Sequence, residues 1–164
     1  MKKLITITLL LVLNSNIALS KNINLLCKAT ANDGKKFTIG FNVDFNKFKL
    51  TDDNNDSHNL YIDDRSFISI ISKRKTEYEV LSAIKIYRSS GKADIELYPL
   101  NNDQMDKLFN QVDIYLDSKD FLNSVDLSIK GNNEVTYAVF LALRNLFNPE
   151  SSAQFMCEQS ANKF

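Results

Sequence analysis

The sequence predicts a single α+β domain in which a curved antiparallel β-sheet packs against one or two helices; a small closed β-barrel is the alternative. Three observations lead to this fold class. Apolar residues alternate with period two in several segments, turn signals separate these segments, and the spacing becomes helical after residue 101. Residues 21–164 are enough for one domain with a core and too few for two.

The first twenty residues have the layout of a secretory signal peptide. Lys2 and Lys3 give a positive start, residues 4–13 are apolar, and Ala18-Leu19-Ser20 supplies small residues at a cleavage site. An apolar run of this length is too short to span a bilayer. We therefore expect an exported chain that begins at Lys21 and works in a bacterial periplasm or outside the cell.

The balance of charge excludes one class of partner. Because Lys2 and Lys3 belong to the signal segment, residues 21–164 carry 18 Lys and Arg against 20 Asp and Glu. This balance gives no general electrostatic attraction to nucleic acid or to an anionic membrane. No apolar stretch after residue 20 reaches the roughly 18 residues of a transmembrane helix, so no membrane anchor is expected.

The pattern of the N-terminal half predicts strands joined by short turns. Residues 37–45 alternate between apolar and polar side chains, and Asn32-Asp33-Gly34 before them predicts a hairpin with residues 25–30. Another strand is expected at 48–50. The polar, Asp- and Asn-rich residues 51–59 indicate an exposed loop.

Strand signals resume after that loop. Strands are expected at 60–62, 67–71, 78–88 and 93–97, and the turn Ser89-Ser90-Gly91 makes the last two a hairpin.

The C-terminal third contains the helical spacing. Met105, Leu108 and Val112 predict an amphipathic helix over 102–116, with Asn102 or Asp103 as its N-cap. A strand is expected at 125–129.

Residues 135–147 leave two readings open. They could form a buried helix capped by Asn133, or residues 135–141 could form a central strand. The good helix formers among them favour the helix slightly.

The chain has two cysteines, Cys27 and Cys157, near the two ends of the expected mature protein. In an oxidising compartment such a pair forms one disulfide. The bridge would hold the first strand against the C-terminal segment.

The Asp- and Asn-rich loop is the closest approach to a metal motif. Asp52, Asn54, Asp56 and Asp63 have the spacing of oxygen ligands in a calcium loop, but Ser57 replaces the turn glycine. A solvated turn is the better interpretation. His58 is the only histidine, which excludes a multi-histidine zinc site. No cofactor is expected.

Residues 26–44 and the tripeptide Ser90-Gly91-Lys92 resemble small exported lysozyme inhibitors. In that family a Cys-bearing strand turns into an alternating strand, and a Ser-Gly loop enters the lysozyme cleft. Asp94 stands where those proteins have a tyrosine. The resemblance implies that Ser90, Gly91 and Lys92 form an interaction loop, but an ordinary hairpin turn is the simpler interpretation of these residues.

These observations favour a non-enzymatic protein of the bacterial envelope that binds an unidentified protein or envelope component. Three alternatives remain: a cell-envelope hydrolase that uses scattered carboxylates, a lysozyme-inhibitor-like protein, and a carrier of an apolar ligand. An apolar cavity inside the sheet would favour the carrier.

Overall fold

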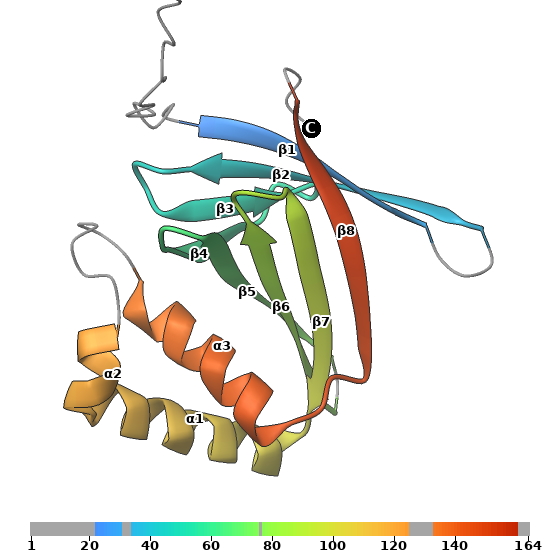
Figure 1. Ribbon diagram of the computed structural model, residues 1–164. Helices are drawn as coiled ribbons and strands as arrows, with labels where there is room; N and C mark the ends of the chain where they lie inside the picture. The colour runs from blue at the N-terminus through green and yellow to red at the C-terminus, as the bar shows by residue number, and fades with distance from the viewer. Residues whose placement is uncertain (1–21, 31–33, 76, 125–132, 161–164) are drawn as a thin grey trace, which may run out of the picture.

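The computed structural model describes residues 22–30, 34–75, 77–124 and 133–160, without the side chains of 122–124. Within these residues eight antiparallel strands form a closed barrel in which each strand pairs with its neighbours in sequence (Figure 1). The strands are β1 (Asn22–Thr30), β2 (Lys36–Asp44), β3 (Lys49–Asp52), β4 (Ser57–Ile62), β5 (Ser66–Arg74), β6 (Glu79–Tyr87), β7 (Lys92–Leu100) and β8 (Ser151–Ser160).

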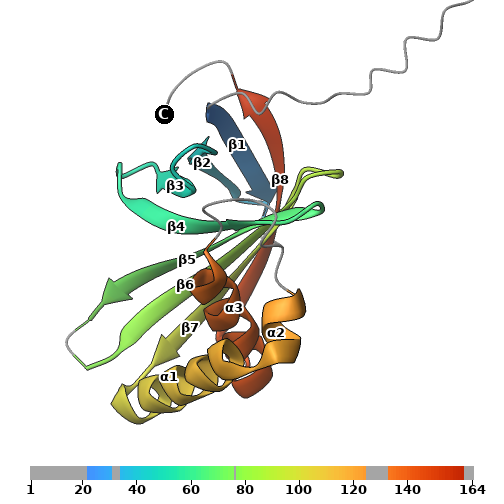
Figure 2. The same ribbon diagram turned by 90° about the vertical axis from the view of Figure 1, so that its left-hand side faces the viewer.

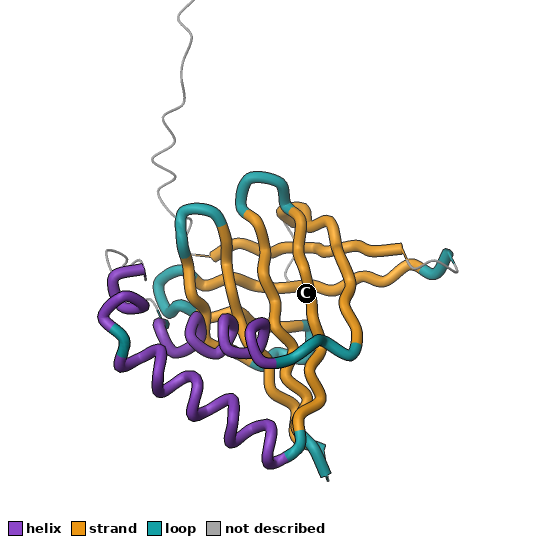
Figure 3. Tube along the Cα trace, turned by 60° about the horizontal axis from the view of Figure 1, so that its bottom comes forward, coloured by secondary structure: helices purple, strands orange, loops and turns teal. Residues whose placement is uncertain are grey.

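Strand β8 closes the barrel, because it pairs with β7 on one side and with β1 on the other. The disulfide lies at this closure: Cys27 and Cys157 face each other across β1 and β8, and a bond joins their sulfur atoms. The predicted pairing of the two cysteines is confirmed. Parts of β1 and β2 extend beyond the rest of the barrel (Figure 3).

Three helices lie between β7 and β8 in the part of the connection that the structure describes: α1 (Asn102–Asp117), α2 (Lys119–Ser124) and α3 (Glu134–Leu146). Figure 2 shows α3 against strands β5 to β7, with α1 beside it. At the start of α1, the side chain of Asn101 accepts a hydrogen bond from the backbone amide of Gln104, and the side chain of Gln104 accepts one from the backbone amide of Asn101. The side chain of Asn133 caps α3 in the same way, by accepting from Thr136.

The helices divide the apolar residues into two cores. Strand β5 is mostly buried from Ser66 to Ile71, because both of its faces are covered. Phe67 and Ile71 point into the barrel, whereas Ile68 points toward the helices. Residues that face the same way as Phe67 form the core of the barrel interior. Residues that face the same way as Ile68 form, with side chains of α1 and α3, a second core that we call the helix-covered core.

The sequence anticipated part of this arrangement. The structure fits the alternative prediction of a small closed barrel. The main prediction, an α+β sheet packed against helices, is met only in part, because helices cover one side of the barrel. The helix at 102–116 is confirmed, although its N-cap is Asn101 rather than Asn102 or Asp103. The helical reading of 135–147 is also confirmed.

One local expectation was wrong, one strand was missed, and two expectations are untested. The loop at 51–59 shrinks to four residues, because β3 runs to Asp52 and β4 begins at Ser57. Strand β8 was not expected at all. The strand expected at 125–129 lies outside the described residues, as does the signal segment. No helix in the described ranges is long and apolar enough to cross a lipid bilayer.

Candidate functional site

The barrel interior is hollow at the end where β3 turns into β4. We call this space the β3–β4 cavity; its volume is about 390 Å³. Its walls come from strands β2, β5, β6, β7 and β8, and their apolar side chains include Ile39, Phe41, Ile71, Ile84, Ile95, Leu97 and Phe155. Protein interiors are normally packed with few voids larger than a water molecule. A space of this size is therefore a candidate site.

Small side chains explain why the space exists. Strand β8 faces the cavity with Ser151 and Ala153 before Phe155 closes its floor, and β6 contributes Ser82. The cavity opens to solvent at this end, where the wall residue Leu97 keeps 36% of its surface exposed. The site is thus reachable from outside the barrel.

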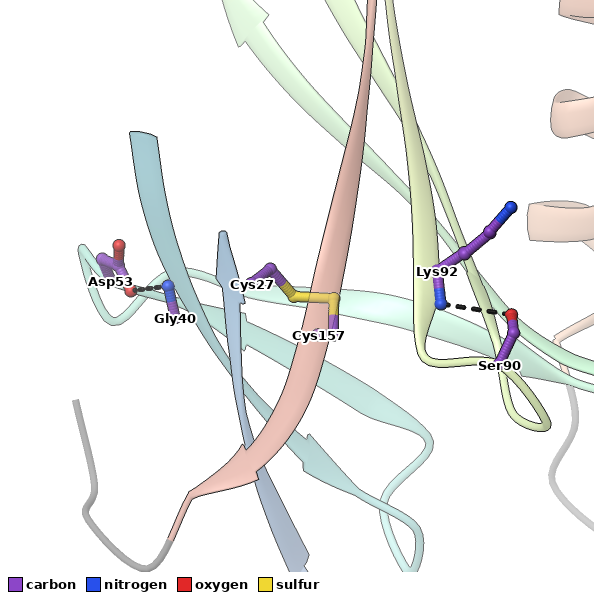
Figure 4. The surroundings of a disulfide bond; sticks show 6 residues. All are labelled: Cys27, Gly40, Asp53, Ser90, Lys92 and Cys157. Carbon is purple, nitrogen blue, oxygen red and sulfur yellow. Dashed lines mark hydrogen bonds between the residues drawn. A yellow bond between two sulfur atoms is a disulfide. The ribbon is translucent and has the colours of Figure 1, made fainter. Parts of the chain in front are cut away.

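Polar groups gather at the mouth. The side chain of Asp53 accepts a hydrogen bond from the backbone amide of Gly40 at 2.7 Å, which joins the β3–β4 turn to β2 (Figure 4). Lys73 at the end of β5 and the β8 residues Ser151 and Ser152 complete the mouth. Two carboxylates and one ammonium group thus border an otherwise apolar cavity.

The second mouth carboxylate, Asp52, is held by its own turn. It accepts hydrogen bonds from the backbone amides of Asn54 at 2.9 Å and Asp56 at 3.1 Å. Burial alone would raise the pKa of Asp52, but these amides and the nearby His58 outweigh it and leave the pKa lowered. This carboxyl group stays ionised near neutral pH and is unsuited to act as a general acid.

His58 does not assemble a catalytic triad. Its Nε2 atom is buried 3.6 Å from the carboxylate of Asp52, and it has no hydrogen-bond partner among the described residues. The neighbouring Ser57 hydroxyl is instead bonded to Thr51 at 2.9 Å. A catalytic serine must be hydrogen-bonded to the histidine that removes its proton. The Ser57 hydroxyl is bonded to Thr51 instead, so this arrangement does not supply an activated nucleophile.

The four residues considered for calcium are separated by the fold. Asp52, Asn54 and Asp56 lie at the β3–β4 turn, whereas Asp63 lies in the β4–β5 turn at the opposite end of β4. Six residues of strand place the two turns roughly 20 Å apart. Asp63 accepts hydrogen bonds from Arg65 and Ser66. In the described part of the chain, no cluster of three or more His, Cys, Asp or Glu residues could hold a metal ion.

The Ser90-Gly91-Lys92 turn lies beside the disulfide (Figure 4). Gly91 has φ +67°, and a Cβ atom there would lie 2.5 Å from the carbonyl oxygen of Cys157. The two residues are also hydrogen-bonded to each other, since the amide of Cys157 donates to the carbonyl of Gly91 at 2.7 Å. The amide of Lys92 donates to the Ser90 hydroxyl at 3.2 Å. The turn therefore has a structural reason for its glycine.

Sequence reasoning did not find the cavity. Its apolar wall residues come from five strands, and only the pairing of these strands brings the side chains together. One signal was present in β8, where the inward positions change from small to large between Ala153 and Phe155. Comparisons with protein-family models, with curated proteins and with solved structures found no match to this chain.

Proposed function

We propose that this chain is an exported, non-enzymatic binding protein that carries a small apolar molecule in the β3–β4 cavity. One observation carries the proposal: about 390 Å³ of open space with mostly apolar walls lies inside the barrel. Small-molecule sites have volumes of roughly 300–1,000 Å³, apolar walls and a few polar groups. Barrels of eight strands are just wide enough to hold one small ligand.

The energetics of packing support a ligand in this space. An unfilled apolar cavity forfeits the dispersion contacts that its wall would make with other atoms. Phe41, Ile84 and Phe155 are buried core residues on this wall, so an apolar guest would restore contacts on their open side. The polar mouth would keep the guest's polar group, where it has one, in contact with water.

The disulfide supports the proposed place of action. Cys27 and Cys157 are bonded, and such bonds persist in oxidising compartments such as a periplasm or the extracellular space. A carrier in that setting would move a poorly water-soluble molecule through an aqueous space.

The test uses residues 21–164, purified with the disulfide formed, and a dye whose emission rises in apolar surroundings. We expect saturable dye binding, weakened at least tenfold by Ala153→Phe, which fills the cavity from β8. Met156→Phe is the matched control, because Met156 lies on the outer face of the same strand with 53% of its surface exposed. Absence of saturable binding, or equal affinity in the two variants, would contradict the proposal.

A further inference from the structure

The opposite end of the barrel contains a second space, which we call the β6–β7 cavity after the turn beside it. Its volume is about 340 Å³. The apolar part of its wall includes Ile23, Leu25, Phe67 and Ile86 from the inner faces of β1, β5 and β6, and Phe45, which directly follows β2. This volume lies in the lower part of the range for small-molecule sites.

The two cavities are separate. They share no wall residue. Between the two ends lies a layer of interior side chains that are fully buried and belong to neither wall: Cys27, Val43, Leu50, Leu60 and Ala93. A molecule bound at one end therefore need not displace a molecule at the other.

The two cavities also differ in charge. Among the described residues, Arg88 is the only charged one on the wall of the β6–β7 cavity, whereas the β3–β4 cavity has Asp52, Asp53 and Lys73. Gln159 adds an amide to the same wall as Arg88. In the described part of the chain, this wall is thus mostly apolar and carries a single positive group.

Arg88 is fixed in place without being neutralised. One of its guanidinium nitrogens donates to the backbone carbonyl of Asp63 at 3.0 Å, and the guanidinium carbon lies 5.6 Å from the ring centre of Phe67. Its backbone amide also donates to the carbonyl of Arg65, at 2.8 Å. No ion pair joins Arg88 to a carboxylate within the described residues. A guanidinium group has five N–H donors in a planar fork, so donors remain for a ligand.

From this arrangement we propose that the β6–β7 cavity is a second binding site, for a small apolar monocarboxylate. The hydrocarbon or aromatic body of the ligand lies against Phe45, Phe67 and Ile86, and its carboxylate accepts hydrogen bonds from Arg88. Guanidinium and carboxylate match in geometry, and a charge-assisted pair at the edge of an apolar cavity is stronger than a neutral hydrogen bond. The site does not depend on the ligand proposed for the other end.

The test measures the binding of decanoate to oxidised residues 21–164 at neutral pH, by calorimetry and by the NMR signal of a labelled carboxylate. Decanol and decylammonium have the same chain with a neutral or a positive head. We expect decanoate to bind most tightly and decylammonium most weakly. Arg88→Gln should weaken decanoate about tenfold or more and leave decanol unchanged, while Arg88→Lys should retain part of the affinity.

The two sites are distinguished with the cavity-filling variant. Ala153→Phe should leave decanoate affinity as in the wild type, since Ala153 lies on the wall of the other cavity. Decanoate that does not bind, or that binds equally to wild type and Arg88→Gln, would overturn the proposal. Loss of decanoate binding in Ala153→Phe with retention in Arg88→Gln would assign the acid to the β3–β4 cavity and also overturn it.

Discussion

The barrel interior and the helix-covered core are both apolar, yet they are packed differently. In the helix-covered core, Tyr61 stacks on Tyr137 with ring centres 4.5 Å apart, and Tyr115 stacks on Phe121 at 5.5 Å. The crevice between β6, β7 and Phe140 leaves no volume for a water molecule. The interior, by contrast, holds open space at both ends.

Polar groups reinforce this difference. At the edge of the helix-covered core, the hydroxyl of buried Tyr98 donates to Glu96 at 2.8 Å, and Arg144 of α3 donates to the other oxygen of Glu96, also at 2.8 Å. Burial, and then the hydrogen bond to Glu96, raises the pKa of Tyr98. A satisfied network of this kind orders a packed layer. The comparison teaches that close packing is concentrated under the helices, whereas the two ends of the barrel interior are left unfilled.

The largest expected effect concerns the barrel closure. Cys27→Ser or Cys157→Ser should each lower the free energy of unfolding by about 4–5 kcal/mol, because the bridge closes a loop with a sequence separation of 130. Chemical denaturation checks this value. The double variant should be little worse than either single one. If protein prepared under oxidising conditions has two titratable thiols, the disulfide between β1 and β8 does not form and this prediction is wrong.

The second prediction compares the two cores with the same chemical deletion. Leu143→Ala removes a fully buried side chain of α3 from the helix-covered core, and should cost about 3 kcal/mol in the free energy of unfolding. Leu97→Ala removes the same atoms from the wall of the β3–β4 cavity, where they are already partly exposed, and should cost less than about 1 kcal/mol. Equal losses in thermal or urea unfolding would contradict the difference in packing.

Local patterns explain what the sequence could predict. The β1–β2 hairpin follows from alternation and a turn signal, and α1 follows from the spacing of Leu108 and Val112 with a polar cap before them. The disulfide follows from two cysteines and the expected compartment. Each of these inferences needs only neighbouring residues or a count.

Strand β8 and the cavities depend on distant contacts, and local patterns missed them. Residues 151–160 are mostly polar, and Phe155 is the only buried residue among them. Because β8 borders open space at one end, it lacks the apolar alternation of a strand that packs on a filled core. Likewise Ser57 and His58 read as loop residues, yet backbone pairing with β3 makes them strand.

The smallest expected effect concerns pH at the mouth of the β3–β4 cavity. The lowered pKa of Asp52 means that its ionised form is favoured by folding. This contribution to the free energy of unfolding is present above the ordinary carboxyl pKa of 3.8 and is lost as pH falls through the lower value in the folded protein. Asp52→Asn should therefore cost about 1 kcal/mol at neutral pH, through weaker acceptance from the amides of Asn54 and Asp56. The cost should shrink on acidification, because the wild-type carboxyl group is then protonated as well.

Asp56→Asn is the control, because it removes one exposed charge from the same turn and should change the free energy of unfolding little at either pH. Urea unfolding of the three proteins across the acid range measures the differences, and an Asp52→Asn cost that stays constant with pH would show that ionisation of this carboxyl group does not stabilise the turn.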